Sequence, residues 1–188
     1  AEDSWIDSAA GVHTSVLNVA GERESLRSAI NEVFESYRTR SPDDHVFIQR
    51  MLTDVRMSGV VMTRTHAIGA PYYVINYDDV TNRTDAATAG REVKTLWAHR
   101  ASVQSIGDPE LRRVIDVVSK IEGLVGHDSL DIEFAISGAT VHILQVRPIV
   151  LRDTPAVVDD DEVAQFVLET ESELLRLDAC PRNLLGSR

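Results

Sequence analysis

The sequence lacks the features expected of membrane, disulfide-stabilised or nucleic-acid-binding proteins. Its single cysteine, Cys180, excludes an internal disulfide and is typical of a reducing compartment, so we expect a cytoplasmic protein. No apolar run is long enough to cross a bilayer, so we expect no membrane partner. A net charge of −11 argues against a nucleic-acid partner, because no basic surface would offset the repulsion between acidic side chains and phosphates.

The composition that remains is that of an ordinary globular domain. Of the 188 residues, 43% are apolar and 26% are charged. This length fits one domain, or one domain with an appendage. Because the first residue is Ala1 rather than Met, we expect the chain to be part of a longer polypeptide.

Residues 129–150 predict a β-hairpin around which the rest of the chain is organised. Apolar and polar residues alternate along both arms, and residues 137–140 form a turn signal. A pairing that is symmetric about Ala139 places Glu133 opposite Gln145.

The same register pairs Asp131 with Arg147, so that one face of the hairpin carries an acid, amide and arginine cluster. On the other face it pairs Phe134 with Leu144, and His142 also lies there as a structural residue. A one-residue slip would destroy both faces together. From the alternation alone, the polar face is either a ligand site or an exposed surface with an ion pair worth ~0–1 kcal/mol.

The hairpin segments DIEFAI and LQVRPI resemble the end of the ATP-grasp nucleotide-binding domain of the phosphoenolpyruvate synthase and pyruvate phosphate dikinase family. The resemblance implies that Glu133 and Gln145 hold Mg²⁺ between the ATP phosphates. It also implies that Arg147 contacts the phosphates, which makes Arg147 and Glu133 the expected catalytic residues. Oxygen donors suit Mg²⁺, and a guanidinium forks onto phosphate. Asp131 is expected to hold Arg147 while ATP is absent.

Two further segments extend the resemblance. AED, S-x-A-G and LNV within residues 1–19 are similar to a family loop near the ATP phosphates, which implies that the backbone of Gly11 approaches them. Residues 45–65 are similar to a family segment that predicts two strands. The first strand would lead to the adenine-binding hinge, with adenine beside Met51 and Leu52.

The match in this second segment rests on Q-x-M, S-G-V and T-R, so Gln49 also belongs to the expected nucleotide-binding residues. A turn is predicted over residues 54–58. The Gly-Leu-Gly-Glu-like stretch of most family members has no counterpart before Gly90. Either Asp78 or Asp79 could therefore supply the acidic contact to the ribose or base.

The spacing of apolar residues and the positions of capping residues predict the other helices and strands. An amphipathic helix over residues 22–39 is expected to pack on the sheet, and strands are expected over residues 71–78 and 92–100. Residues 109–125 predict a helix that is capped by Asp108 and ended by Gly126. A last helix over 159–177 is expected to have a solvated charged side.

The predicted fold class is α+β, with a mostly antiparallel sheet and packed helices. The resemblance assigns residues 1–150 to the C-terminal subdomain of an ATP-grasp domain, and residues 151–188 to a linker and helix that lead to further domains. It implies an enzyme that binds Mg²⁺ and ATP and transfers phosphate to a carrier histidine on another domain, and ultimately to pyruvate. The isolated chain is expected to be inactive, because the family lysine and arginine of a second subdomain are absent.

Two alternatives remain at this stage. The chain could be a degenerate nucleotide-binding or interaction module without transfer activity, which the missing Gly-Leu-Gly-Glu stretch favours. It could also belong to a related ATP-dependent dikinase with a different phosphoryl acceptor.

Overall fold

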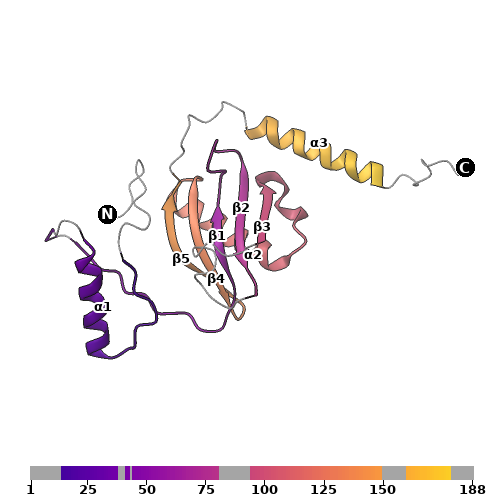
Figure 1. Cartoon of the computed structure of the whole chain (residues 1–188). Coiled ribbons are helices and arrows are strands. Elements are labelled where there is room, and N and C mark those ends of the chain that lie inside the picture. Colours follow the sequence, from indigo (N-terminus) through magenta and orange to yellow (C-terminus); the bar gives the residue numbers. More distant parts are fainter. Residues whose placement is uncertain (1–13, 38–40, 43, 81–93, 150–159, 179–188) are drawn as a thin grey trace, which may run out of the picture.

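The computed structural model describes residues 14–37, 41, 42, 44–80, 94–149 and 160–178 (Figure 1). Five strands form one antiparallel sheet in the order β3-β2-β1-β4-β5. The strands are β1 Val55–Met62, β2 Tyr72–Asp78, β3 Lys94–His99, β4 Leu130–Ser137 and β5 Thr140–Pro148. Together with three α-helices, this sheet confirms the α+β class.

Helix α2, Pro109–Val125, covers one face of the sheet and forms the core with it (Figure 1). Asp108 caps its first turn by accepting hydrogen bonds from the backbone N–H groups of Glu110 and Leu111, and Gly126 ends it in a left-handed conformation with φ of 71°. The predicted helix is therefore confirmed at both ends. The core consists of fully buried side chains from both elements, each contributing about 1.5–3 kcal/mol: Leu111, Val114, Ile115, Val118, Val61, Ile75, Ile132, Phe134 and Ile136.

Strand β1 occupies the centre of the sheet, and Gly59 is what allows the close approach of its neighbour. A Cβ atom at this position would lie 2.2 Å from the carbonyl oxygen of Asn76 and 2.9 Å from Cα of Tyr77. Both are backbone atoms of β2, so the two strands would have to move apart. Ser58, which the sequence places at the end of a turn over residues 54–58, is instead a fully buried residue of β1.

Of the two strands predicted within residues 45–65, the second is confirmed as β1, and the prediction of the first is wrong. The structure has one strand there, β1, and residues 44–54 before it have no helix or strand. Asp54 adopts a left-handed conformation with φ of 57°, which bends the chain at the point where pairing begins. The apolar side chains before this bend remain outside the core, with Phe47 84% exposed.

Helix α1, Arg23–Glu35, forms where a helix is predicted, but the expectation that it packs on the sheet is wrong. None of its residues is buried. Figure 1 shows the helix standing apart from the sheet, beyond the β5 edge. Phe34 on its apolar side makes an edge-to-face contact with Tyr37, just beyond the end of the helix.

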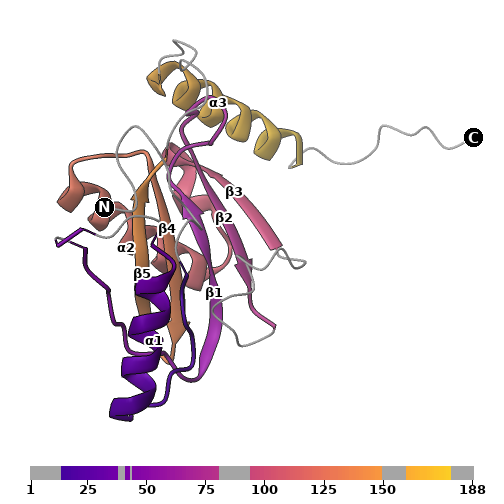
Figure 2. The same cartoon turned by 60° about the vertical axis from the view of Figure 1, so that its left-hand side comes forward.

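The predicted strands at 71–78 and 92–100 are confirmed as β2 and β3, within the described residues. A short 3₁₀ helix, η1 Arg100–Ser105, follows β3. The predicted last helix is confirmed as α3, Asp160–Asp178, which lies across one end of the sheet near η1 (Figure 2). Among the described helices, none is both long enough and apolar enough to span a membrane.

Candidate functional site

The β4–β5 hairpin has the predicted register at its open end. Glu133 pairs with Gln145, and Asp131 pairs with Arg147. Because side chains alternate between the faces of a strand, these four residues lie on one face. They point away from the face that carries Ile132 and Phe134, which are fully buried under α2. We call these four residues the hairpin site.

The turn half of the hairpin follows a different register, and the predicted pairing of Phe134 with Leu144 is wrong. Phe134 pairs with Ile143, and the register shifts between Glu133 and Phe134. Leu144 is the extra residue of a β-bulge. Without the bulge, the tight turn would place Glu133 opposite Leu144. The bulge therefore brings Gln145 beside Glu133.

The bulge also changes the faces of the residues nearest the turn. Val141 and Ile143 pack against the core, although the sequence places them on the polar face. His142 pairs with Ala135, which shares the face of Glu133. The prediction that His142 lies on the apolar face is therefore wrong.

Asp131 holds the guanidinium of Arg147, as predicted. Arg147 Nε donates to Asp131 Oδ2 at 2.9 Å, and Nη2 lies 2.8 Å from the same oxygen. The other oxygen, Oδ1, is buried and has no hydrogen-bond partner among the described residues. The Arg147 side chain is only 24% exposed, so this pair is better defined than an ordinary surface ion pair.

Glu133 is half-buried and makes no hydrogen bond or ion pair with any described residue. Burial raises the pKa of its carboxyl group; the positive charge of Arg147 lowers the pKa, and the negative charge of Asp131 raises it again. The net effect is a raised pKa, so the positive charge of Arg147 does not fully offset the burial of this carboxyl group. A cation bound there would favour its charged form.

Two oxygen donors of the hairpin site, from Glu133 and Gln145, could hold a magnesium ion whose remaining ligands come from elsewhere. Mg²⁺ is commonly held by one or two protein oxygens, with substrate phosphates and water completing the octahedron. Glu133 and the amide oxygen of Gln145 are directly opposite each other across the strands, so their Cβ atoms are about 4.5–5.5 Å apart. In the described part of the chain, no three His, Cys, Asp or Glu side chains form a group that could hold a metal by themselves.

The other residues expected to contact the nucleotide do not lie on the helices or strands that form the hairpin site. Gln49 and Met51 are exposed and Leu52 is half-buried, all on the segment before β1. This segment is attached to the turn end of the hairpin, where Ser137 Oγ donates to the carbonyl of Thr53 at 3.0 Å. Gly11 lies outside the described residues.

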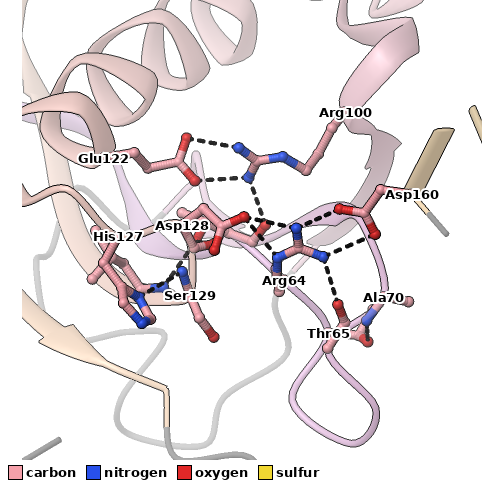
Figure 3. A network of polar contacts seen from close by, with 12 residues as sticks. Arg64, Thr65, Ala70, Arg100, Glu122, His127, Asp128, Ser129 and Asp160 are labelled. Carbon is pink, nitrogen blue, oxygen red and sulfur yellow. Dashed lines mark hydrogen bonds and ion pairs between the residues drawn. The ribbon is translucent and has the colours of Figure 1, made fainter. Parts of the chain in front are cut away.

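A second polar cluster, which the sequence did not suggest, lies where β1 ends and β4 begins (Figure 3). Arg64 donates from Nε and Nη2 to Asp128 Oδ2 at 3.0 and 2.7 Å, and from Nη1 to the carbonyl of Gly69 at 2.9 Å. It also pairs with Asp160 of α3, with Nη1 lying 3.2 Å from Oδ1. Arg64, Asp128 and Asp160 form what we call the Arg64 cluster.

An ion pair between the partly buried Arg100 and the buried Glu122 adjoins the Arg64 cluster. Arg100 donates from Nη1 and Nη2 to Glu122 at 2.7 and 3.1 Å, and Nη1 also donates to the carbonyl of Thr63. The hydroxyl of Tyr73 donates to Glu122 at 2.9 Å. The sequence does not predict these contacts, because the residues that make them come from segments far apart along the chain.

No protein-family model matches the chain, and a search of curated proteins finds no match either. Any functional assignment therefore depends on the geometry of the hairpin site and on the resemblance of its two sequence segments.

Proposed function

We propose that the polar face of the β4–β5 hairpin is one wall of a Mg²⁺-nucleotide site. The chain would be the C-terminal ATP-grasp subdomain of a phosphoenolpyruvate synthase-like phosphotransferase. The observation that carries this proposal is the paired register at the open end of the hairpin. It places Glu133 beside Gln145, and Arg147, held by Asp131, one row farther along the same face.

Each residue of the hairpin site has a role in this proposal. Glu133 and the Gln145 amide oxygen would hold Mg²⁺, which when bound neutralises charge on the phosphates. Arg147 presents its guanidinium to a phosphate, and Asp131 orients that guanidinium without touching the nucleotide. Catalysis by such a site consists of positioning and charge neutralisation during phosphoryl transfer.

The remaining parts of the reaction come from the resemblance. The phosphate would pass to a carrier histidine on another domain and ultimately to pyruvate. Gln49, Met51, Leu52 and Gly11 remain proposed contacts to the nucleotide. A different acceptor is compatible with the same ATP site.

A specific observation supports a second candidate, a nucleotide-binding or interaction module without transfer activity. Residues 44–54, where the resemblance implies a strand and an adenine hinge, have no regular secondary structure. An intact hinge is expected to present its backbone to the base in a fixed geometry. A site without it would bind the phosphates and discriminate poorly between bases.

The test is a titration of the 188-residue chain with ATP in the presence of Mg²⁺, followed by two-dimensional amide NMR. We expect weak binding, because the lysine and arginine that the resemblance implies lie on a second subdomain. The shifts should concentrate on β4 and β5, disappear in Glu133→Gln and persist in Glu32→Gln. Glu32 is exposed on α1 and undergoes the same loss of charge.

Two results would contradict the proposal. Shifts that avoid the hairpin would move the nucleotide elsewhere. Equal responses of Glu133→Gln and Glu32→Gln would remove Glu133 from the site.

A dissociation constant near micromolar, measured by calorimetry, would show that this chain forms a complete site without a second subdomain. Equal affinities for ATP and GTP would favour the module over the transferase.

A further inference from the structure

Arg64 joins helix α3 to the strand ends beside the hairpin site (Figure 3). Its side chain is only 18% exposed, whereas its α3 partner Asp160 is 45% exposed. Asp160 lies in the first turn of α3, 96 residues away along the chain. One charged contact therefore fixes the start of the helix to the domain.

The remainder of α3 is attached weakly. None of its described side chains is buried, and a stripe of half-buried residues faces the domain: Asp160, Val163, Ala164, Val167 and Glu171. The second polar contact is a long hydrogen bond of 3.3 Å from Ser102 Oγ to Glu171 Oε2. Because so little apolar area is covered, docking of α3 depends heavily on its polar contacts.

The surface close to α3 is also polar. His99 is 6% exposed, and its Nδ1 accepts a hydrogen bond from the backbone N–H of Ala101. Its Nε2 is buried without a partner among the described residues. The carboxylates of Asp160 and Glu171 and the guanidinium of Arg100 are close enough to affect its charge, and the ring of Tyr72 meets it edge-on. This surface does not resemble a hydrophobic core, so its exposure would not be prohibitive.

We propose that Arg64 is an electrostatic latch that holds α3 on the domain reversibly. In the docked state Arg64 binds Asp160, Asp128 and the carbonyl of Gly69. In the released state it keeps Asp128 and Gly69, so no buried charge is left without a partner. Release thus breaks the Arg64–Asp160 pair and the Ser102–Glu171 hydrogen bond, and leaves the contacts within the sheet in place.

The latch is close to the hairpin site in the fold. Met62, two residues before Arg64, pairs with Asp131 on β4. Asp128 is three residues before Asp131. The same strand ends therefore support both the guanidinium that holds α3 and the carboxylate that holds Arg147, and α3 would move relative to the hairpin site on release.

Hydrogen exchange measured by mass spectrometry on the whole 188-residue chain tests the latch. A helix in a protein owes most of its stability to tertiary packing, so release should speed exchange of the α3 amides. Asp160→Asn should speed exchange across α3 by about tenfold, the effect of losing one charge-assisted contact. Exchange in β1 and β4 should not change. Raising NaCl from about 0.05 to about 0.5 M should speed the same amides in the unmodified chain.

Glu162→Gln is the matched control, because it removes one negative charge from the same first turn of α3 at an exposed position. Equal exchange of α3 in Asp160→Asn and Glu162→Gln would overturn the latch, since the effect would then be one of helix charge alone. Faster exchange in β1 and β4 together with α3 would also overturn it, because Asp160 would then stabilise the whole domain.

Discussion

Two arginine–aspartate pairs lie at the same end of this sheet and differ in how completely their polar atoms are satisfied. In the Arg64 cluster, one guanidinium is shared between two carboxylates and a backbone carbonyl. In the hairpin site, Arg147 contacts a single oxygen of Asp131, whose other oxygen is buried without a partner among the described residues.

The electrostatic consequences have opposite signs. Arg64 lowers the pKa values of Asp128 and Asp160, so those carboxylates are stabilised in their charged forms. Burial raises the pKa of Glu133 in the hairpin site. The fully paired Arg64 cluster fits a role in structural attachment, whereas the incompletely paired carboxylates beside Arg147 support the proposed ligand site.

The largest effect is expected from Glu122→Ala, which breaks the buried ion pair beside the Arg64 cluster. Arg100 would keep the carbonyl of Thr63 but lose its carboxylate, and Tyr73 would lose its acceptor. We expect the free energy of unfolding to fall by about 3–5 kcal/mol in urea titrations. The control is Glu110→Ala, which breaks the more exposed pair with Arg56 and should cost only about 0–1 kcal/mol. Similar losses in both variants would mean that the buried network is not structurally dominant.

In the hairpin site the same loss of a carboxylate should affect function instead of folding. In a full-length enzyme that contains this chain, we expect Glu133→Gln to lower the turnover number by roughly 100-fold or more, as for removal of one preorganised electrostatic group. The melting temperature should remain at or slightly above that of the unmodified enzyme. Glu32→Gln, assayed in parallel, should leave turnover unchanged. Turnover that survives in Glu133→Gln would place the metal elsewhere.

The smallest and most discriminating effect is a difference in pH dependence. The folded pKa of Glu133 lies above its usual value, so Glu133→Gln should stabilise the chain at pH 7. This gain should shrink as the pH falls through the raised pKa and vanish below about 4.5. The folded pKa of Asp160 lies below its usual value of 3.8, so Asp160→Asn should destabilise the chain at pH 7. This loss should begin to shrink near pH 3.8 and disappear only below the lowered folded pKa.

Urea titrations of the three proteins between pH 3 and pH 7 check this prediction. The curves for the two variants should lie on opposite sides of the unmodified chain at neutral pH. If both variants are destabilised at pH 7, Glu133 has a stabilising partner, and the contrast between the two clusters does not hold.

The hairpin shows how far alternation of residues can predict a register. The pairs Glu133–Gln145 and Asp131–Arg147 follow from symmetry about Ala139, and the structure confirms them. The pairing nearest the turn could not be predicted, because it depends on a bulge at Leu144. A bulge changes the register by one residue without breaking the apolar pattern, since Val141 and Ile143 are as apolar as Leu144.

The segment before β1 shows the opposite limit. Its alternation predicts a strand, yet strand pairing requires a neighbouring edge, and none is present for residues 44–54 in the part of the chain that the structure describes. Helix α1 is comparable: its periodicity predicts the helix, but not which surface it meets. A local pattern of residues indicates which secondary structure a segment favours, whereas the surface that the segment packs against depends on the rest of the fold.

The sequence by itself determined the α+β class, helices α1, α2 and α3, strands β2 and β3, and the identity of the residues in the hairpin site. Residue spacing and helix capping involve only a few neighbouring residues, so these features depend on short stretches of the sequence. Only the tertiary structure decided that the central strand already includes Ser58, that α1 stands apart, and that Arg64 meets Asp160. These contacts depend on which distant segments the folded sheet brings together, and no local pattern of residues carries that information.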